Sequence, residues 1–244
     1  MKFFRRSELN TACQTQLAHY DKTVADAVGP DYSYPLRMRD WELCQILTAM
    51  DSADRNDRIL DTGSFNTYLG VYLARQHSRV TVSDLLSSRC AKSLMRKIGL
   101  APRKPTEASY FKWKRTVKRA GVAVRSLDLT QLACPDASFD RVIALSVIEH
   151  VPAVERTLAE MFRVLAPGGK LLITTDCSPK PMPYHKGVRY FSPAELEQIF
   201  APYPVTSARN EPDFSPENWC YNIGQPVVTA FAEITKHQAG SGKG

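Results

Sequence analysis

Apolar residues recur along this chain with two alternating periods, and the change from one to the other marks the first unit of the fold. In RILDTGSFNTYLGVYLA (58–74), a short apolar run ends at Asp61 and Gly63 follows at once. From Tyr68 to Leu73, apolar side chains recur at helical spacing. We therefore expect a strand, a tight turn around the glycine, and a helix.

The same alternation continues through the rest of the chain. Strands are expected at 79–85, 122–132, 139–151 and 170–176, with apolar runs near 203–207 and 227–234 completing the sheet. Helices are expected over Glu8–Val28, 37–50 and 88–98, after Pro152, and from the capping box that starts at Ser192. Strands that alternate with helices predict an α/β fold with a mostly parallel sheet.

The chain of 244 residues is long enough for one sizeable domain with its own core. The predicted organisation is an N-terminal helical cap at 1–54, an α/β domain at 55–237 with a basic insertion at 87–121, and a tail at 238–244. The tail, rich in Gly and Ser, is expected to be flexible.

The opening unit has the layout of a nucleotide-binding turn. Gly63 would let the backbone approach a ligand closely, and the following helix would present unpaired N–H groups. The next strand ends at Asp84, 23 residues after Asp61. A carboxylate at that place can accept hydrogen bonds from both hydroxyls of a ribose, and the alternative role of Asp84 is a helix N-cap.

The net charge of +7 is concentrated in one segment. Between Arg89 and Arg119 there are eleven Lys or Arg residues and a single acid, Glu107. Aromatic residues interleave with the cations in YFKWKRTVKRA (110–120), a pattern suited to stacking on bases or binding anionic lipid. The alternative, which we favour, is an amphipathic insertion whose aromatic residues pack against the body of the protein.

The six cysteines are far apart in sequence and form no C-x-x-C pair. Their spacing argues against a metal site and against a disulfide framework, and it predicts a reducing, cytoplasmic environment. No apolar run approaches the roughly 20 residues that span a bilayer, so integral membrane association is not expected. The N-terminus, MKFFRRSELN, lacks the apolar core of a signal peptide.

Several of these features occur together in a known family. The order Asp61-x-Gly63, Asp84, Asp128-Leu129, then FDRVIALSVIEHV (139–151) and LAEMFRVLAPGGKLLITT, resembles the class I S-adenosylmethionine-dependent methyltransferases, in particular small-molecule, type 11-like members. The resemblance covers about residues 55–200. It implies a Rossmann-like, doubly wound, mostly parallel seven-stranded sheet with helices on both faces, and S-adenosyl-L-methionine as cofactor.

The resemblance also implies roles for individual residues in cofactor binding. Gly63 would lie under the methionine moiety, while Asp84 would bind the ribose, Asp128 the adenine amino group, and Ser146 would line the place where methionine and acceptor meet. The full predicted set is Asp61, Gly63, Ser64, Phe65, Asp84, Leu85, Asp128, Leu129 and Ser146.

The turn at Gly63 departs from the family pattern D-x-G-x-G-x-G. Phe65 and Thr67 replace the second and third glycines, so side-chain bulk stands where backbone usually approaches the ligand. The hydroxyls and amide of Ser64, Asn66 and Thr67 offer alternative contacts. The missing glycines also disfavour an NAD site, because a pyrophosphate needs the same close approach.

Three residues are candidate proton acceptors. His150 ends the fourth predicted strand and is a candidate because histidine is the side chain that most often exchanges protons near neutral pH, although it could equally orient the following turn. Asp176 ends the fifth predicted strand, and His185 lies in the Pro-rich segment PKPMPYHKGVRYF. That segment is expected as a loop that reaches the acceptor site, where Tyr184, Arg189 and Tyr190 are the candidate acceptor-binding residues.

Three functions remain open at this stage. The first is methyl transfer to an oxygen, nitrogen or possibly carbon nucleophile of a small molecule, such as a sugar or a secondary metabolite. The second is methylation of RNA held by the basic 89–119 segment. The third is a non-catalytic scaffold in which Phe65 closes the cofactor pocket.

Overall fold

The computed structural model describes residues 1–29, 32, 39–65, 67–85, 105–185, 187–220 and 226–237. The helix expected at 88–98 and the tail at 238–244 lie outside these ranges. The helices are α1 (Thr11–Val28), α2 (Asp40–Met50), α3 (Leu69–Leu73), α6 (Pro105–Arg119), α7 (Val154–Val164) and α8 (Pro193–Phe200), with short 3-10 helices η1 (Arg6–Glu8), η3 (Ile148–His150) and η4 (Pro216–Asn218).

The central sheet has seven strands in the order β1-β9-β6-β5-β2-β3-β4. These strands are β1 (Lys2–Phe3), β2 (Arg58–Thr62), β3 (Arg79–Ser83), β4 (Ala123–Arg125), β5 (Phe139–Leu145), β6 (Leu165–Cys177) and β9 (Val228–Thr235). Strands β4, β3, β2, β5 and β6 run parallel, and β9 is antiparallel to both of its neighbours. The predicted doubly wound α/β fold is confirmed.

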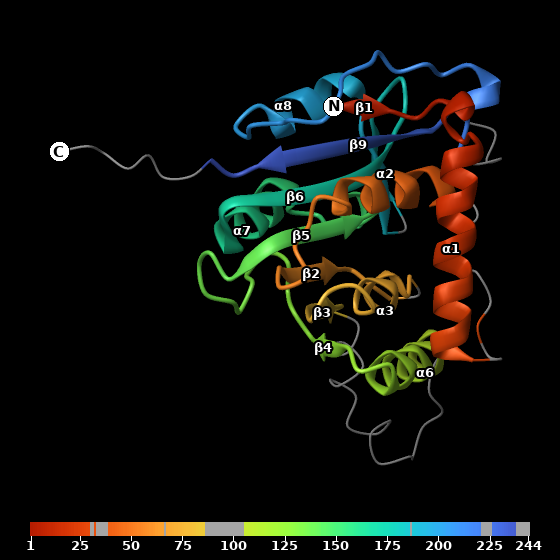
Figure 1. Ribbon diagram of the computed structural model, residues 1–244. Coiled ribbons are helices and arrows are strands. Elements are labelled where there is room, and N and C mark those ends of the chain that lie inside the picture. Colours follow the sequence, from red (N-terminus) through yellow and green to blue (C-terminus); the bar gives the residue numbers. More distant parts are fainter. Residues whose placement is uncertain are drawn as a thin grey trace.

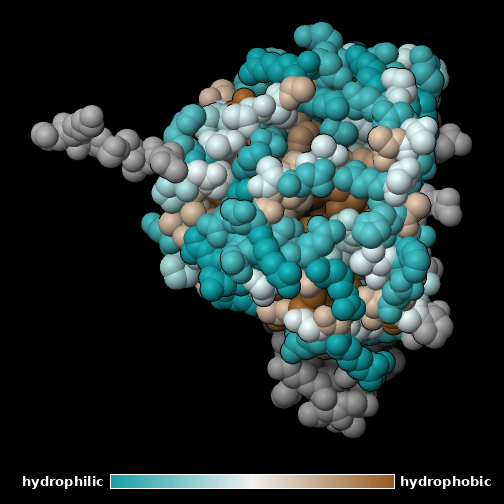
Figure 2. Space-filling view, viewed as in Figure 1, coloured by the Kyte–Doolittle hydropathy of each residue, from teal (hydrophilic) through white to brown (hydrophobic). Residues whose placement is uncertain are grey.

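The two faces of the sheet carry separate hydrophobic cores, because alternate residues of a strand point to opposite faces. On β2 and β5, Ile59 and Ile143 pack with α1, α2, α3 and α6, whereas Leu60 and Val142 pack with α7 and α8. Figure 2 shows one side of the molecule, on which hydrophobic residues emerge only in patches among hydrophilic ones. In the described part of the chain, no helix is long and apolar enough to span a membrane.

Helix α1 lies across the carboxyl ends of the parallel strands (Figure 1). Its start is fixed by Asn10, whose side chain accepts the backbone N–H of Cys13 at 3.1 Å, so the helix begins three residues later than predicted. The carboxyl ends of parallel strands are where α/β proteins bind ligands. Helix α1 therefore borders the region where a site is expected.

Residues 1–54, predicted as an N-terminal helical cap, contain α1 and α2 and also contribute a strand to the central sheet. Strand β1 pairs with β9 at the edge of the central sheet, in the register Lys2 with Phe231. Of the run expected to complete this edge, 203–207, only Val205 forms a bridge to β9. The reason is that Pro202 and Pro204 lack the N–H groups that a paired strand needs.

Other element boundaries also differ from the prediction. The third strand, expected at 122–132, ends at Arg125, and the fourth ends at Leu145 before η3. The fifth begins earlier, at Leu165, and the helix expected from Pro152 begins at Val154. The capping box at Ser192 is confirmed. The segment expected as a loop after β6 forms a hairpin, β7 (Met182–His185) and β8 (Val188–Tyr190).

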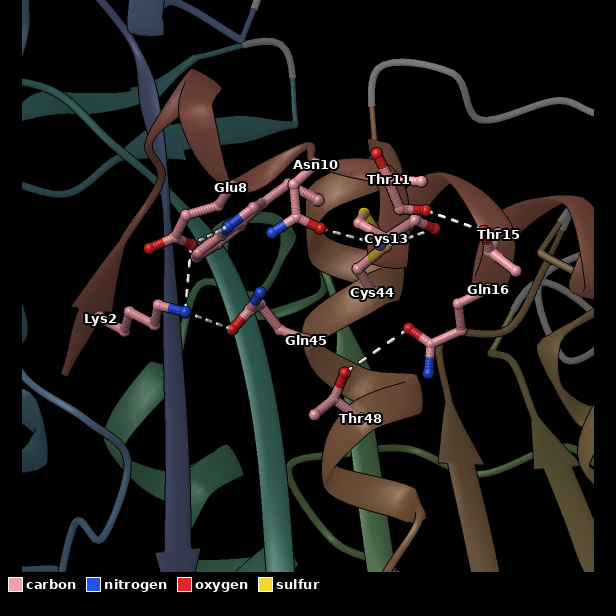
Figure 3. Close-up of a disulfide and its surroundings, with 11 residues drawn as sticks. Lys2, Glu8, Asn10, Thr11, Cys13, Thr15, Gln16, Cys44, Gln45 and Thr48 are labelled. Atoms are coloured by element: carbon pink, nitrogen blue, oxygen red, sulfur yellow. Dashed lines mark hydrogen bonds and ion pairs between the residues drawn. A yellow bond between two sulfur atoms is a disulfide. The ribbon is translucent and has the colours of Figure 1, made fainter.

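One expectation about the cysteines is wrong. Cys13 of α1 and Cys44 of α2 form a disulfide (Figure 3). The two residues are 31 positions apart, and only the packing of α1 against α2 brings them together. Cysteine spacing alone carries no information about such a pairing, so the prediction of no disulfide failed.

The described part of the basic insertion is α6, which packs one face on the body. Tyr110 and Trp113 are buried, whereas Phe111 is 37% exposed. Pro105 begins this helix, at a position where a missing N–H costs nothing. The favoured interpretation, an insertion whose aromatic residues pack inward, holds for Tyr110 and Trp113.

Candidate active site

A side chain at the first position of the glycine turn after β2 would be strained and crowded. Gly63 has φ +61°, in the left-handed region, and a Cβ built on it would lie 2.7 Å from Cγ2 of Val147. Val147 follows β5, the neighbouring strand. The turn and the segment after β5 are therefore in contact.

Hydroxyl groups close this turn from within. The Ser64 hydroxyl donates to the Asp61 carbonyl at 2.6 Å, and the Thr67 hydroxyl donates to the Ser64 carbonyl at 3.0 Å. Tyr20 of α1 donates from its buried hydroxyl to the Thr67 carbonyl at 2.5 Å. The hydroxyls of Ser64 and Thr67, expected as ligand contacts, are thus used to hold the backbone, and Asn66 lies outside the described residues.

A cavity of about 310 Å³ opens beside this turn at the carboxyl ends of β2, β3 and β5. It brings together five of the nine residues predicted for the cofactor, and also His150. Its lining comprises Gly63, Asp84, Leu85, Leu127, Asp128, Leu129, Thr130, His150, Val151 and Pro152. Asp61, Ser64, Phe65 and Ser146 are not among the described residues that line it.

The two carboxylates in the cavity wall are held by backbone groups. Asp84 accepts the N–H of Phe65 at 3.4 Å, and its own N–H donates to the carbonyl of Arg125 on β4. Asp128 accepts the N–H and the hydroxyl of Thr130 at 2.9 and 2.7 Å, as in an Asx-turn. Neighbouring leucine side chains give the same cavity apolar walls.

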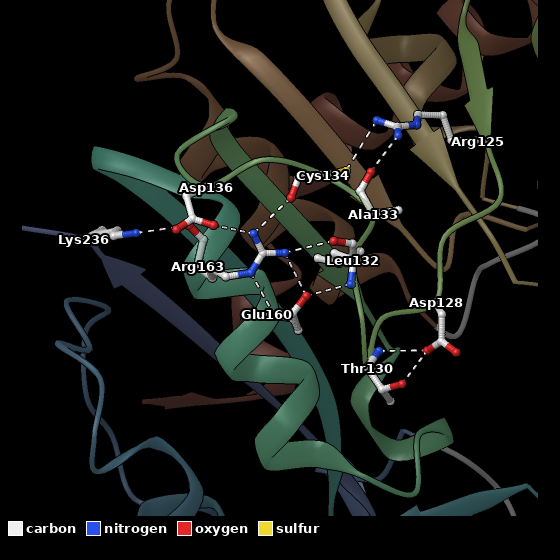
Figure 4. A network of polar contacts seen from close by, with 10 residues as sticks. All are labelled: Arg125, Asp128, Thr130, Leu132, Ala133, Cys134, Asp136, Glu160, Arg163 and Lys236. Carbon is white, nitrogen blue, oxygen red and sulfur yellow. Dashed lines mark hydrogen bonds and ion pairs between the residues drawn. The ribbon is translucent and has the colours of Figure 1, made fainter.

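An arginine anchors the loop that carries Asp128 (Figure 4). The Arg163 guanidinium, from α7, donates to the carbonyls of Leu132 and Cys134 at 2.9 and 3.0 Å. It also pairs with Glu160 and Asp136, both of which raise the pKa of Arg163. The polar network therefore fixes the loop from behind the cavity.

Phe65 does not fill the cavity. Its ring lies against the rings of Tyr110 and Trp113 on α6, with centroids 5.6 and 5.9 Å apart. Aromatic pairs at such distances stabilise one another beyond simple burial. Phe65, which replaces the second glycine of the family pattern, thus connects the glycine turn to α6.

Asp61 lies beneath the turn and is fully buried. Burial raises its pKa to about 7, an effect that Ser64 and the N–H of Gly70 only partly oppose. Gly70, the second residue of α3, packs closely on β3, since an added Cβ would overlap the side chain of Val82. Asp61 therefore supports the glycine turn from below and does not line the cavity.

A second polar region lies next to the cavity, and we call it the carboxylate cluster: Arg39, Glu42, Glu149 and Asp176. The Arg39 guanidinium lies 2.8 Å from a Glu42 oxygen, 3.8 Å from Asp176 and 4.0 Å from Glu149. The three acidic side chains are at most 4% exposed, and Arg39 is 16% exposed. Residues from α2, η3 and β6 thus surround one guanidinium.

Hydroxyl groups satisfy part of this cluster. Glu42 accepts from Ser146 at 2.8 Å and from Thr174 at 2.5 Å. Glu149 accepts from Thr175 at 3.0 Å through Oε2, while its Oε1 makes no hydrogen bond within the described part of the chain. Burial, together with the charge of Glu42, raises the pKa of Glu149 to about 7, against the lowering effect of Arg39.

The predicted catalytic residues lie in different surroundings. His150 lines the cavity, and its Nδ1 lies 2.8 Å from the Gly187 carbonyl. Because a carbonyl only accepts, Nδ1 carries the proton and the neutral ring has its lone pair on Nε2. Asp176 belongs to the carboxylate cluster, and the side chain of His185 lies outside the described part.

The predicted acceptor-binding residues also lie in different surroundings. Tyr190 lies near the carboxylate cluster, since burial and the charges of Asp176 and Glu149 raise its pKa. Arg189 instead pairs with Glu195 at 3.3 Å and stacks on Phe191, away from the cavity. The side chain of Tyr184 lies outside the described part.

The sequence prediction missed Arg39, Glu42 and Glu149. Glu149 precedes His150 in the motif FDRVIALSVIEHV (139–151). It is buried because it lies in η3, where its side chain points into the protein. Arg39 and Glu42 begin a helix more than 100 residues earlier, so no local pattern connects them to β5. The signal that could have been used is Glu42 itself, an acidic residue among the apolar positions of the helix predicted at 37–50.

Comparison with known proteins agrees with this architecture. A family model described as "Methyltransferase domain" matches residues 60–173. A probable S-adenosylmethionine-dependent methyltransferase of Mycolicibacterium smegmatis is 44% identical over 54 residues, which is 22% of this chain and 21% of the relative. The chain therefore matches only about a fifth of that relative's length.

Solved structures share the fold along nearly the whole chain. The [4+2]-cyclase SpnF has a TM-score of 0.59 at 16% identity and covers 94% of this chain and 98% of its own. The 1,6-didemethyltoxoflavin N1-methyltransferase of Burkholderia thailandensis, solved with S-adenosylhomocysteine, has a TM-score of 0.53 at 18% identity, with 96% and 87% covered.

The domain match, the strand order and the glycine turn all point to the same kind of domain. Residues 60–173 thus match a methyltransferase domain, and the strand order is the Rossmann-like one of the class I S-adenosylmethionine-dependent methyltransferases.

Proposed function

We propose that this protein transfers the methyl group of S-adenosyl-L-methionine to an oxygen, nitrogen or carbon nucleophile of a small-molecule acceptor. The observation that carries the proposal is the cavity at the carboxyl ends of β2, β3 and β5. It is lined by Gly63, Asp84 and Asp128, which come from three separate segments and to which the family pattern assigns cofactor contacts.

The chemistry of the cavity fits a nucleoside. Two carboxylates, Asp84 and Asp128, can accept hydrogen bonds from hydroxyl and amino groups. Leu85, Leu127 and Leu129 provide apolar surface for a flat ring. Because Phe65 packs on α6, its bulk does not oppose this fit, which argues against a scaffold with a closed pocket.

The bound sulfonium supplies an activated methyl group, so the protein mainly orients the reactants and excludes water. Asp84 and Asp128 would hold the nucleoside, and Gly63 would leave room beside it. His150, which lines the cavity and whose Nδ1 bonds to the Gly187 carbonyl, would serve as a proton acceptor.

Calorimetry with S-adenosylhomocysteine, the demethylated product, tests cofactor binding directly. Asp84→Ala should weaken binding by about 2–3 kcal/mol, the scale of lost hydrogen bonds to a charged group. Asp26→Ala, which removes an exposed acid of α1 that pairs with Lys22, should bind like the wild type. Absence of binding by the wild-type protein would overturn the proposal.

A labelled methyl group then separates transfer from other activities of the fold. Label that moves from the cofactor to a small molecule in a cell extract supports methyl transfer. Binding of the cofactor without any transfer would instead favour a reaction such as that named for the cyclase SpnF.

RNA as acceptor is a weaker candidate. Helix α6 does expose Lys112, Arg115, Lys118 and Arg119. However, Tyr110 and Trp113, two of the aromatic residues expected to stack on bases, are buried against the body. Tight RNA binding that weakens steeply with salt would favour this candidate over a small molecule.

A further inference from the structure

Helix α6 has one buried and one exposed side. Tyr110, Trp113 and Val117 recur at helical spacing and are buried against the body. The opposite side is exposed and comprises Phe111, Lys112, Arg115, Lys118 and Arg119. We call these five residues the outer face of α6. It contains cations and one aromatic ring, and no acid.

The positive charge of the outer face is not neutralised within the described part of the chain. Arg115, Lys118 and Arg119 form no ion pair there. The segment 89–119 holds eleven Lys or Arg residues and one acid, whereas the whole chain has a net charge of +7, so the other residues are acidic overall. A negatively charged surface is therefore attracted to this segment and not to the rest of the molecule.

The aromatic ring of the outer face belongs to Phe111. It is 37% exposed and is the one exposed large hydrophobic side chain in the described part of the chain. Arg115 lies one turn further along the same side of the helix. An exposed phenylalanine surrounded by cations is typical of amphipathic helices that lie in the interface of a bilayer.

From these features we propose that the outer face of α6 docks the protein on the surface of an anionic lipid bilayer. Arg115, Lys118 and Arg119 contact lipid phosphates, and Phe111 enters the boundary between headgroups and acyl chains. The helix keeps its buried side on the protein, at the periphery of the molecule next to the edge strand β4 (Figure 1). The inference does not depend on the proposed function, because it concerns what the protein docks on and not what it methylates.

Other anionic partners fit the outer face less well. Nucleic acid binding without sequence preference relies on aromatic faces that are open to bases, and Tyr110 and Trp113 are buried. A folded protein partner needs an apolar patch at the centre of the interface, and the outer face offers only Phe111. Cations around a single exposed ring match the layered chemistry of a bilayer surface.

Sedimentation with large vesicles tests the docking directly. The protein should sediment with vesicles of phosphatidylcholine and phosphatidylglycerol in equal parts, and not with vesicles of phosphatidylcholine alone. Sodium chloride should release it, because salt screens exposed charges. Inorganic phosphate at the same ionic strength should release no more than sodium chloride does, since a separate anion offers no boundary for Phe111.

Neutralising the outer face should weaken vesicle binding. Each cation near an anionic surface contributes about fivefold in affinity, so Arg115→Gln/Arg119→Gln should bind at least about tenfold more weakly. Arg115→Lys/Arg119→Lys keeps the charges and should bind like the wild type. All four substitutions are at exposed positions and leave the buried side of α6 unchanged.

A matched control removes the same charge from the other side of the sheet. Arg79→Gln/Arg156→Gln neutralises two exposed arginines. Arg156 belongs to α7, and Arg79 points to the face that α7 covers, because Thr81, two residues further along β3, pairs with Leu60. This variant has the net charge of the α6 variant and should bind vesicles like the wild type.

Substitutions of Phe111 separate insertion from simple attraction of charges. Phe111→Ala removes the apolar contact and should weaken binding to anionic vesicles severalfold, with its salt dependence retained. Phe111→Trp supplies a ring suited to the interface and should restore binding. The fluorescence of the new tryptophan should shift to shorter wavelength with anionic vesicles and remain unchanged with phosphatidylcholine.

Several outcomes would overturn the docking proposal. These are absence of vesicle binding, equal binding to both kinds of vesicle, specific release by inorganic phosphate, and an equal loss in the two arginine-to-glutamine variants. Tight RNA binding without vesicle binding would likewise replace the bilayer as partner. S-adenosylhomocysteine affinity, measured on the same proteins, reports on the cofactor site, so its absence would overturn the proposed function and leave the docking proposal intact.

Discussion

The hydroxyl of Ser146 donates a 2.8 Å hydrogen bond to Glu42, which lies 104 residues earlier in the chain. This bond joins the end of β5 to the first turn of α2, and Glu42 continues the contact to Thr174 on β6. Ser146 has φ +50°, a left-handed conformation that is rare for serine. Strained residues persist where surrounding contacts hold them, and here the contacts belong to the carboxylate cluster.

Substitutions of Ser146 separate its hydrogen bond from its backbone strain. Ser146→Ala removes the hydroxyl and keeps the unfavourable φ, so we expect a loss of about 1–2 kcal/mol in the free energy of unfolding. Ser146→Gly removes the same bond but relieves roughly 1 kcal/mol of left-handed strain. Urea unfolding should therefore rank Gly above Ala, and the reverse order would show that the φ of Ser146 carries no strain.

Gly63 offers a test of the contact between the glycine turn and β5. Gly63→Ala should cost about 1–3 kcal/mol, because its Cβ overlaps Val147, and should weaken S-adenosylhomocysteine binding. Gly121→Ala is the matched control, since Gly121 has φ +85° and nothing within 4 Å of an added Cβ. In the Val147→Ala background, Gly63→Ala should cost only about as much as Gly121→Ala does in the wild type, and an unchanged penalty would place the strain elsewhere.

Asp61 should make stability depend on pH. Its pKa is raised to about 7 in the folded protein from an ordinary value of 3.8, so the folded state binds the proton more tightly. That stabilisation is fully present below about pH 4 and is lost as pH rises through 7. The difference amounts to on the order of 4 kcal/mol.

Urea unfolding at several pH values measures this effect. Asp61→Asn should flatten the decline between pH 4 and 7, whereas Asp26→Asn on the exposed face of α1 should leave it unchanged. Asp140, whose pKa is lowered by Arg58, acts in the opposite sense and is common to all three proteins. Parallel curves for the wild type and Asp61→Asn would contradict the raised pKa.

The fold was predictable because its signals are local. Apolar runs mark the parallel strands in the sequence, and Gly63 marks the turn after β2. The alternation of strands and helices was enough to predict a mostly parallel sheet and a site at its carboxyl edge. The residues that line the cavity lie at the ends of those strands. Their positions follow from the topology alone, since the carboxyl ends of neighbouring parallel strands meet at one edge.

The parts that sequence reasoning missed depend on contacts between distant segments. Strand β1 pairs with β9 across more than 200 residues, and a strand of two residues has no periodicity to detect. Glu42 and Glu149 each look like ordinary charged residues in sequence. Only packing of α2 against the sheet buries both around Arg39, and no local pattern encodes that burial.

The disulfide between Cys13 and Cys44 is the remaining contact of this kind, and it is directly testable. It ties α1, which holds the glycine turn through Tyr20, to α2, which carries Glu42. Closing a loop of this size constrains the unfolded chain, so reduction should lower the free energy of unfolding by roughly 3 kcal/mol. A Cys13→Ser/Cys44→Ser double variant should lose a similar amount and become insensitive to reductant.

Thermal unfolding with and without dithiothreitol measures this loss, and Cys134→Ser, at a buried free thiol, is the control that should still respond to reductant. Because Tyr20 of α1 bonds to the glycine turn, the reduced protein should also bind S-adenosylhomocysteine more weakly, since part of the binding energy would be used to reorder α1. Equal stability and equal affinity in both redox states would mean that packing of α1 on α2 holds the helices in place without the covalent bond.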